Sequence, residues 1–319
     1  MVNTESSQTS HLAYVLITPA RNEEAFIEQT IKSVVSQTIL PFKWVIVSDG
    51  STDATDDIVK KYTVDHQWIE LVRMPERGER HFAGKVHAFN AGYAKVRDLN
   101  YDIIGNLDAD ISFDNDYFEF LLTKVEQNPK LGVAGTPFIE DSATPYNYRF
   151  TSIEHVSGAC QLFRRECFEA IGGYKPFRRG GIDLVAVITA RMKGWQTRTF
   201  TEKTCFHHRK MGSAIQKDLV AIFGGGKGDY VMGVDPVWEL FRTFYQMTRR
   251  PLVLGGLYRL AGFVWAMATR MEILVPDELA EFRKKEQRKR LLEFFTNFVL
   301  RQSANAQNRD HIDSGSANK

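Results

Sequence analysis

The chain has 319 residues, of which 43% are hydrophobic and 25% are charged, so it is long enough for one large globular domain or two smaller ones. Its formal net charge of +2 argues against a general nucleic-acid-binding protein. Cys160, Cys167 and Cys205 are too sparse and irregular for a disulfide framework, and they fit a reducing compartment. The first ten residues lack the order of a signal peptide, and no apolar run is long enough to predict a clear transmembrane helix.

Strand-like and helix-like segments alternate from residue 12 to about residue 136. The expected strands are 14–17, 44–47, 69–72, 103–107 and 133–135. The expected helices are 25–37, 52–62, 85–96 and 116–127. Continuous apolar strands separated by helices predict an α/β fold with a mostly parallel sheet flanked by helices. In such sheets, ligands bind at the carboxyl ends of the strands.

After residue 137 the pattern becomes less regular. Further expected elements are a helix at 183–193, a strand at 197–200, an aromatic-rich helix at 238–247, an apolar segment at 252–271 and a basic-apolar segment at 276–300. We expect these domains: a flexible N-terminus (1–12), the main domain (13–232), a helical basic-apolar region (233–301) and a disordered tail (302–319). The helical region fits an appendage packed on the main domain, an amphipathic surface for an anionic membrane, or both.

The segment Leu-Asp-Ala-Asp at residues 107–110 follows the fourth expected strand. Residues i and i+2 of a strand project to the same face, so Asp108 and Asp110 can aim their oxygens at one point. Mg²⁺ and Mn²⁺ prefer oxygen ligands and bind through one or two carboxylates together with substrate phosphates. The motif therefore predicts a metal bridging the protein and a diphosphate, although two such residues at a strand end are also common in solvated loops.

Two other polar loops follow the first and second expected strands. They are Pro-Ala-Arg-Asn-Glu-Glu at residues 19–24 and Ser-Asp-Gly-Ser-Thr-Asp at residues 48–53. Asn22 is an expected N-cap of the first helix. Because the carboxyl ends of parallel strands share one edge of the sheet, these loops and the D-x-D segment predict a pocket there.

Four segments resemble, in order, the motifs of family 2 glycosyltransferases with the GT-A fold. They are 17–24 (ITPARNEE), 49–53 (DGSTD), 84–92 (GKVHAFNAG) and 107–110 (LDAD). The resemblance extends over residues 14 to about 212. It implies an inverting, metal-dependent hexosyltransferase that uses Mn²⁺ or Mg²⁺. Such an enzyme moves a sugar from a nucleotide-diphosphate sugar, most often a UDP-sugar, to a hydroxyl acceptor.

The resemblance also implies which residues bind the nucleotide. They are Pro19, Ala20, Arg21, Glu23, Asp49, Ser51, Lys85, Asp108 and Ala109. Glu23 suits ribose hydroxyls or helix capping, and Asp49 suits a nucleobase edge or a turn. Ser51 fits a cap of the following helix better than a ligand contact. Lys85 offers a positive charge to a diphosphate at a helix start, where a cation is otherwise slightly unfavourable.

Inverting transfer needs a base that takes the proton of the acceptor hydroxyl. In the family this base is an Asp in a Glu-Asp pair at the start of a helix, which Asp183 matches. Ile182 stands where Glu is usual, so acceptor recognition stays open, and a helix N-cap is the alternative role of Asp183.

The resemblance implies that the metal ligands are Asp110, Asp108 and a histidine. His207 and His208 point to opposite faces of a strand, and we prefer His208 as the ligand.

Three other protein classes share some of these sequence features. A non-catalytic sugar-nucleotide-binding protein remains open if Asp183 is not a base. A D-x-D phosphatase would carry its motif after the first strand, and a dinucleotide oxidoreductase would carry G-x-G-x-x-G there. The resemblance and the basic-apolar C-terminal region suggest bacterial surface polysaccharide or glycolipid synthesis. The acceptor would be a saccharide or lipid-linked saccharide, and the enzyme would be cytoplasmic with peripheral contact to the inner membrane face.

Overall fold

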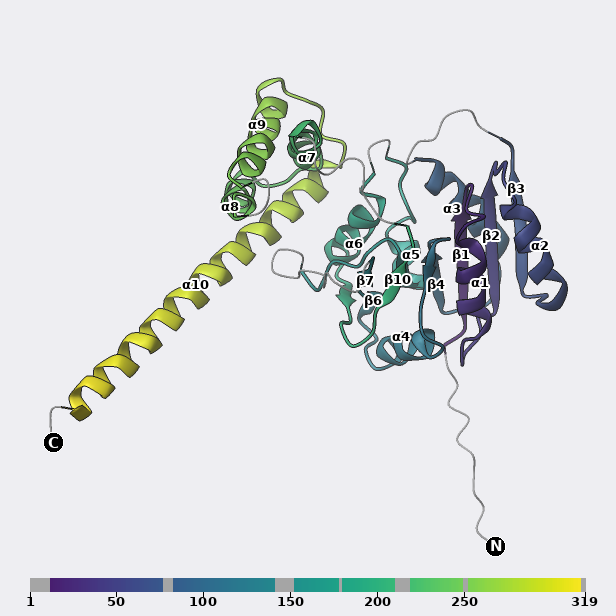
Figure 1. Cartoon of the computed structure of the whole chain (residues 1–319), viewed down its shortest axis with the longest axis horizontal. Helices are drawn as coiled ribbons and strands as arrows, with labels where there is room; N and C mark the ends of the chain where they lie inside the picture. Colours follow the sequence, from purple (N-terminus) through teal and green to yellow (C-terminus); the bar gives the residue numbers. More distant parts are fainter. Residues whose placement is uncertain are drawn as a thin grey trace, which may run out of the picture. The chain divides into compact units, whose positions relative to one another are not determined.

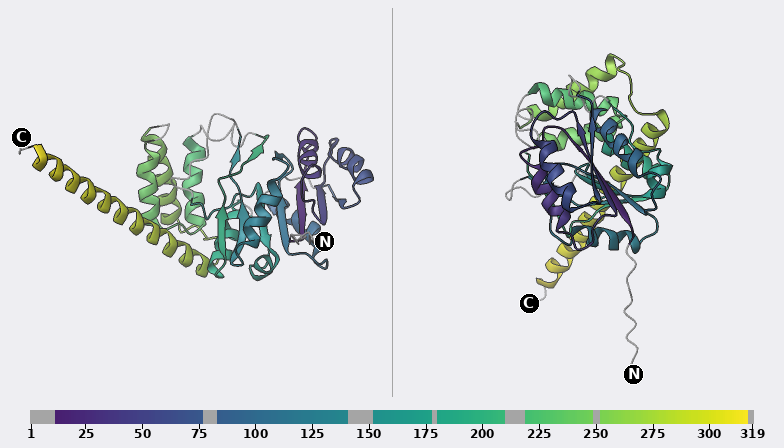
Figure 2. Two further views of the ribbon diagram at one scale, coloured as in Figure 1. Left: turned by 90° about the horizontal axis from the view of Figure 1, so that it is seen from below. Right: turned by 90° about the vertical axis from the view of Figure 1, so that its right-hand side faces the viewer.

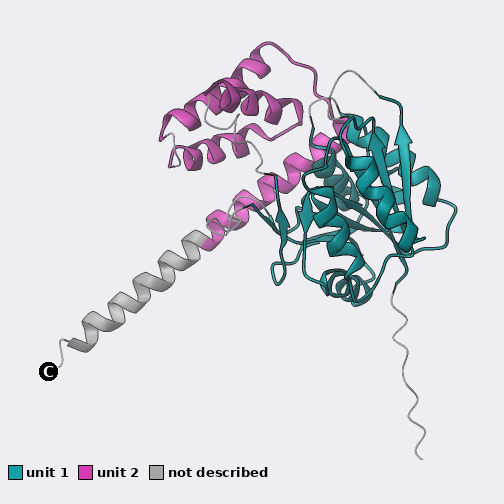
Figure 3. Cartoon of the chain, turned by 45° about the vertical axis from the view of Figure 1, so that its right-hand side comes forward, with its two compact units in different colours: residues 1–213 teal, residues 214–319 magenta. Residues whose placement is uncertain are grey.

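The computed structural model describes residues 12–76, 83–140, 152–177, 180–209, 219–248 and 252–316, with side chains as far as residue 297. The chain forms two compact units, residues 1–213 (unit 1) and residues 214–319 (unit 2), shown in Figure 3. The boundary between them lies before helix α7 (Leu219–Val231), whereas the sequence placed it after residue 232. The difference arises because α7 packs against α9 (Leu254–Ala268) of unit 2.

Unit 1 is built on a seven-stranded sheet with the order β3-β2-β1-β4-β8-β6-β9. These strands are β1 (Tyr14–Ala20), β2 (Lys43–Asp49), β3 (Ile69–Met74), β4 (Ile103–Leu107), β6 (Leu131–Gly135), β8 (Cys160–Arg164) and β9 (Gln196–Thr199). Neighbouring strands are parallel except at β8, which is antiparallel to β4 and β6. The mostly parallel α/β sheet is thus confirmed. Strand β8 was not expected, because Gln161 interrupts its apolar residues.

Helices cover both faces of this sheet, as Figures 1 and 2 show. One core contains side chains of α1 (Ile27–Val35), α2 (Thr55–Asp65) and α4 (Tyr117–Glu126). The other contains side chains of α3 (Ala83–Val96), α5 (Arg165–Ala170) and α6 (Ile182–Met192). Along β1, Leu16 belongs to the first core and Val15 and Ile17 to the second, as the alternation of a strand requires.

A second sheet of three short strands lies beside the D-x-D segment. Its order is β5-β10-β7, with β5 (Ile111–Ser112), β10 (Cys205–His207) and β7 (Phe138–Ile139). Strand β10 is antiparallel to β5, and His207 pairs with Ile111, the residue directly after Asp110. This pairing brings a segment almost one hundred residues distant in sequence to the D-x-D carboxylates.

Two capping predictions in the first loops are wrong. Helix α1 begins at Ile27 and α2 at Thr55, so neither Asn22 nor Ser51 stands at the N-cap of the helix that it precedes. Asn22 has a positive φ of 55°, and its Oδ1 accepts a hydrogen bond from the Thr52 N–H at 2.9 Å. The Asn22 N–H in turn donates to Ser51 Oγ at 3.2 Å. These polar side chains therefore join the two loops to each other.

Unit 2 is helical and comprises α7, α8 (Pro236–Gln246), α9 and α10 (Asp277–Ser316). Helix α10 continues past residue 302, where the sequence predicted a disordered tail. Between Pro276 and Gly315 the sequence contains no proline or glycine to end a helix. In the described part of the chain, no helix is long and apolar enough to cross a membrane.

Several basic residues of α10 are bound within unit 2. Arg288 pairs with the buried Asp235 at 2.7 Å, and Arg283 donates to the Met232 carbonyl at 2.6 Å. Lys284 pairs with Glu281 one turn away. Part of the basic run therefore holds the unit together, and a membrane role for the whole run stays a prediction.

Candidate active site

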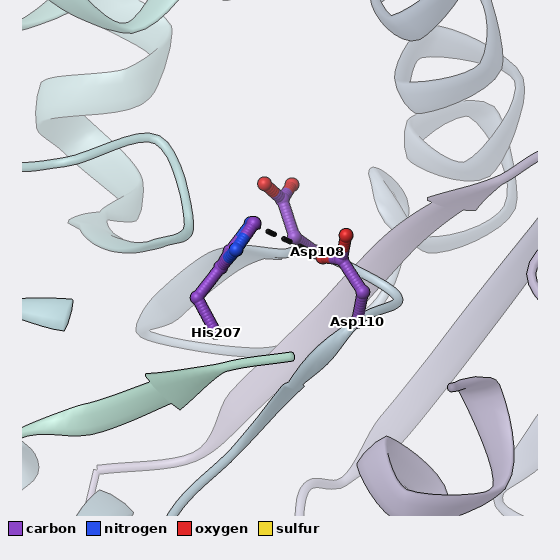
Figure 4. A group of neighbouring side chains, drawn as sticks. All are labelled: Asp108, Asp110 and His207. Atoms are coloured by element: carbon purple, nitrogen blue, oxygen red, sulfur yellow. Dashed lines mark ion pairs between the residues drawn. The ribbon is translucent and has the colours of Figure 1, made fainter. Parts of the chain in front are cut away.

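The D-x-D segment follows β4 and presents its two carboxylates to a histidine. Asp108, Asp110 and His207 each offer one ligand atom, and these atoms lie within 4.8 Å of one another (Figure 4). His207 Nε2 is 3.5 Å from Asp110 Oδ1. The other ring nitrogen, Nδ1, hydrogen-bonds the Arg209 carbonyl, which can only accept, so Nδ1 carries the proton. Nε2 is therefore the nitrogen that faces the carboxylates.

The geometry favours His207 over His208, which the sequence interpretation preferred. The two residues have different partners. His208 Nε2 lies 2.9 Å from Ser112 Oγ, and its ring stacks with Phe26. Burial lowers the pKa of His208, although the nearby Asp110 carboxylate partly opposes that effect. Only the register of β10 against β5 decides which histidine turns inward, and the sequence alone does not fix that register.

Lys85 lies in the first turn of α3 and forms an ion pair with Asp108. Burial alone would lower the pKa of the Lys85 ammonium, but the carboxylates of Asp108, Asp183 and Asp110 more than offset it and raise the pKa. Burial raises the pKa of Asp108, with Lys85 opposing and Asp110 adding to the rise. The three carboxylates and the ammonium therefore form one electrostatic group.

Asp183 reaches the same place from the first turn of α6. Its Oδ2 accepts a hydrogen bond from the Gly158 N–H at 3.1 Å. The Gly158 carbonyl accepts from Asn106 Nδ2 at 2.8 Å and from Lys85 Nζ at 3.4 Å. Gly181, with a φ of 79°, occupies the N-cap of α6, so the alternative role of Asp183 as the N-cap is wrong.

These groups border one cavity of about 300 Å³. Its lining residues are Lys85, Val86, Phe89, Asn106, Asp108, Phe138, Ser157, Gly158, Ala159, Gln161, Tyr174, Gly180, Gly181, Ile182, Asp183 and His207. A buried hydrogen-bond chain supports one wall, in which Tyr174 donates to Gln161 at 2.6 Å and Gln161 donates to the Val156 carbonyl at 2.8 Å. The cavity thus combines an ammonium, carboxylates and apolar walls, as small-molecule sites commonly do.

Arg209 is a site residue that the sequence interpretation missed. Its guanidinium forms an ion pair with Glu23 and lies 3.3 Å from Asp110 Oδ2. It thereby connects the loop after β1 with the D-x-D segment. The available signal was its position directly after the two histidines, but a lone arginine in a loop is too common to identify a site.

The other predicted nucleotide-binding residues lie at the ends of β1, β2 and β4. Pro19 and Ala20 end β1, Arg21 follows them, and Asp49 ends β2 as a buried residue. The Ala109 carbonyl accepts a hydrogen bond from Thr30 at 2.9 Å, which anchors the D-x-D turn to α1. The first two loops meet through Asn22 and Ser51, but neither loop lines the described cavity. Their contacts with a nucleotide stay predictions.

The donor set at the D-x-D segment fits a divalent cation. Two carboxylate oxygens and one imidazole nitrogen suit Mn²⁺, and the hydrogen bond at His207 Nδ1 orients the ring as second-shell partners of metal ligands do. Lys85 and Arg209 pair with Asp108 and Asp110. A cation would compete with these two ion pairs for the same oxygens.

Comparisons with known proteins identify the family of the chain. The family model described as glycosyl transferase family 2 matches residues 15–181. Poly-beta-1,6-N-acetyl-D-glucosamine synthase of Staphylococcus epidermidis is 27% identical over 158 residues, which are 49% of this chain and 35% of that protein. The probable glycosyltransferase YdaM of Bacillus subtilis is 28% identical over 202 residues, which are 59% of this chain and 44% of that protein. The chain thus spans less than half the length of these relatives.

Two solved structures share the fold. The mannosyltransferase PcManGT from Pyrobaculum calidifontis, in complex with GDP-Man and Mn²⁺, gives a TM-score of 0.53 at 17% identity, covering 92% of this chain and 85% of that one. TarS 1–349 of S. aureus, in complex with UDP, gives 0.54 at 12% identity, covering 81% of this chain and 92% of that one. Because the family model extends over more than half of the sequence and the structure has the matching fold, the chain belongs to glycosyl transferase family 2 and is a glycosyltransferase.

Proposed function

We propose that this glycosyltransferase transfers a sugar from a nucleotide-diphosphate donor to a hydroxyl acceptor, with inversion at the anomeric carbon and Asp183 as the base. The observation that carries the proposal is the meeting of Asp108, Asp183 and Lys85 on one cavity. Asp108 and Lys85 come from the elements that bear the nucleotide-sugar motifs, while Asp183 comes from α6. The proposal thus places the diphosphate-binding group and the general base on the same cavity.

The proposed base is oriented before any acceptor binds. The Gly158 N–H holds Oδ2 of Asp183, and the second carboxylate oxygen stays available to the hydroxyl of the acceptor. As that hydroxyl attacks the anomeric carbon, Asp183 takes its proton, and the nucleoside diphosphate departs from the opposite face of the sugar. A single displacement of this kind inverts the anomeric configuration.

Two positive groups beside the D-x-D segment are the proposed partners of the departing diphosphate. Lys85 would leave its ion pair with Asp108 and pair with the diphosphate instead. Arg209, beside Glu23 and Asp110, would add a second positive charge near the diphosphate. When bound, Mn²⁺ or Mg²⁺ would be held by Asp108, Asp110 and His207 and would neutralise charge on the diphosphate. Glu23 and Asp49 remain the proposed partners of the ribose and the base.

The proposed acceptor is a saccharide or lipid-linked saccharide in surface polysaccharide or glycolipid synthesis. Support comes from the poly-N-acetylglucosamine synthases among the relatives. The matched region is only about a third of each of these proteins. Ile182, in place of the usual glutamate, lines the cavity beside Asp183. The acceptor would therefore meet an apolar side chain at this point.

A donor screen tests the proposal. Wild type would be heated with UDP-glucose, UDP-N-acetylglucosamine or GDP-mannose, with Mn²⁺ or with EDTA, and release of the nucleoside diphosphate would be measured in parallel. At least one donor should raise the Tm in Mn²⁺ but not in EDTA, because a ligand that binds only the native state stabilises it. The exposed-site control Asp98→Asn should behave like wild type. If no donor raises the Tm or releases its nucleotide, the proposal is wrong.

A further inference from the structure

Exposed apolar side chains are concentrated in unit 2. Among the described residues, fifteen of the twenty exposed large hydrophobic side chains lie in this unit, although it is about half the length of unit 1. Isolated exposed hydrophobic residues are normal on a protein surface, whereas a dense set points to an interaction surface. The exposed apolar side chains of unit 2 therefore point to an interaction surface on its helices.

Helix α8 has its polar side turned inward. Its fully buried residues are Glu239 and Thr243, while Val237, Leu240 and Phe244 are exposed. A helix on the surface of a water-soluble domain has the opposite distribution, with apolar residues facing the core. The exposed side of α8 is thus the side that water solvates poorly.

The interior that α8 faces contains charged groups. Arg259 of α9 pairs with Asp229 of α7 and, at 3.1 Å, with Glu239 of α8. Arg242 of α8 pairs with Asp229 at 3.2 Å. These ion pairs connect three helices through polar contacts. Unit 2 therefore has a polar cluster inside and apolar helix faces outside.

Helix α9 continues the exposed apolar surface. Its exposed positions are Leu254, Leu257, Tyr258, Ala261, Val264, Trp265, Met267 and Ala268. None of these residues is charged. The inner side carries Gly262, where an added Cβ would lie 2.0 Å from the Phe223 carbonyl oxygen of α7. The two backbones approach closely at small residues, and the buried Phe263 of α9 packs against Tyr230 of α7. The exposed large side chains of α9 are therefore not needed for that contact.

We propose that the exposed apolar faces of α8 and α9 form a lipid-binding surface that lies in one leaflet of an anionic membrane. A polar interior combined with an apolar exterior suits a helical unit whose surroundings are partly hydrocarbon. Trp265 and Tyr258 are the side chains that favour the membrane–water interface. At about 1.5 Å per residue, the 15-residue α9 is about 22 Å long, shorter than a hydrocarbon core of about 30 Å. The helix would thus lie along the interface.

Charge favours a membrane over a second copy of the chain. Basic residues outnumber acidic ones between residues 214 and 319, and two positively charged copies would repel each other. Arg270 lies two residues after the end of α9 and is exposed, and the side chain of Lys289 of α10 is 78% exposed. Arg270 is exposed to anionic headgroups, and Lys289, whose ion pair with Glu293 at 3.9 Å is itself exposed, can exchange that partner for a headgroup.

A matched pair of triple variants of the full chain tests this surface. The test variant is Leu257→Gln, Val264→Gln, Trp265→Gln, whose residues are 46%, 44% and 56% exposed. The control is Leu40→Gln, Val64→Gln, Phe42→Gln in unit 1, whose residues are 45%, 77% and 57% exposed. Co-sedimentation would use phosphatidylcholine vesicles with and without phosphatidylglycerol, at low salt and at high salt. All six side chains are solvent-exposed, so neither variant should lose its fold.

We expect the test variant to lower the partition coefficient about tenfold or more at high salt, because it removes the salt-insensitive apolar contribution. The control variant should bind like wild type. Independently, brominated lipid should quench wild-type tryptophan fluorescence more strongly than that of Trp265→Phe. Light scattering would measure the oligomeric state, and iodide quenching would measure the solvent exposure of Trp265.

Four results would overturn the proposal. The first is that wild type does not sediment with vesicles at any salt concentration, and the second is that the test variant binds as wild type does. The third is a dimer in light scattering that the test variant alone dissociates, which would assign the surface to a second copy. The fourth is a monomer without lipid affinity whose Trp265 resists iodide, which would show that another part of the chain covers this face.

Discussion

The Gly158 N–H donates a hydrogen bond to Asp183 Oδ2 at 3.1 Å, and no side chain at position 158 separates the two residues. An added Cβ on Gly158 would lie 3.0 Å from the Asp183 Cβ and 3.1 Å from Oδ2. The backbone φ of Gly158 is not positive, so the glycine is needed here for close approach and not for its conformation. This peptide therefore sets the position of the proposed base.

Gly158→Ala should displace the Asp183 carboxylate without preventing folding. A displacement of about 1 Å in a reacting group can cost about a hundredfold in rate, so we expect kcat to fall between about tenfold and a hundredfold. The donor Kd should stay unchanged, because the alanine methyl group meets Asp183 and not the diphosphate-binding groups. Gly228→Ala, where no atom lies within 4 Å of an added Cβ, is the matched control. Wild-type kcat in Gly158→Ala would show that this contact does not position the base.

The two histidines should differ in their effect on metal binding. His207→Ala removes the nitrogen grouped with Asp108 and Asp110, so the Mn²⁺ concentration giving half-maximal activity should rise about tenfold to a hundredfold. His208→Ala removes a hydrogen bond to Ser112 and ring contacts with Phe26 and Phe206, but no atom of the Asp108–Asp110–His207 group, so it should leave that concentration near the wild-type value. Titration of activity with Mn²⁺ compares the variants. Equal effects in both, or a larger effect in His208→Ala, would contradict the assignment of His207.

Asp110→Ala should abolish transfer and leave the fold intact, because this carboxylate contacts the polar groups His207 and Arg209 and not the apolar core. The loss of metal binding is measured as the shift of Tm that Mn²⁺ causes in the absence of donor. This shift should disappear in Asp110→Ala. Asp98→Ala, at an exposed ion pair, serves as control. Near wild-type activity of Asp110→Ala in EDTA would disprove the metal site.

Glu239 should make the stability of unit 2 depend on pH. Burial raises the pKa of Glu239 to about 8, with Asp229 adding to the rise and Arg259 opposing it. Its pKa in the unfolded chain is about 4.3, so the unfolded state ionises first. The stability contributed by Glu239 is therefore fully present below the pKa of the unfolded chain, about 4.3, and is lost as the pH rises toward the pKa of the folded state, about 8.

Glu239→Gln should remove this dependence, because glutamine does not ionise. We expect the free energy of unfolding to change less between pH 5 and pH 8 in the variant than in wild type, as measured by urea denaturation. Glu293→Gln, at a side chain 59% exposed on α10, should keep the wild-type pH dependence. An identical pH profile in Glu239→Gln would mean that Arg259 keeps the carboxylate ionised throughout this range.

The alternation of apolar strands and helices was enough to predict the α/β sheet, since β1, β2 and β4 are nearly continuous buried runs such as Ile103–Leu107. The motif residues Lys85, Asp108 and Asp183 could also be found from sequence, because each belongs to a segment of recognisable composition. Their convergence on one cavity agrees with the general position of ligand sites at the strand ends.

Features that depend on long-range pairing could not be predicted. Arg209 and His207 reach the D-x-D segment only because β10 pairs with β5, and both strands are too short for a sequence pattern. Gly158 has no signal beyond its residue type. In unit 2, the apolar pattern of α8 would place Val237 and Leu240 inside, whereas the structure buries Glu239. Helical periodicity identifies an apolar face but does not say whether protein or another apolar medium covers it.

Asp183→Asn tests the central claim most directly, because asparagine keeps the size of the side chain and cannot accept the acceptor's proton. Single-turnover transfer and equilibrium donor binding would be measured on the same preparation with Mn²⁺. We predict a loss of about 10²–10⁴-fold in kcat, with the donor Kd unchanged, as expected for removal of a general base. Wild-type turnover, or equal losses in donor affinity and turnover, would contradict the assignment of Asp183 as the base.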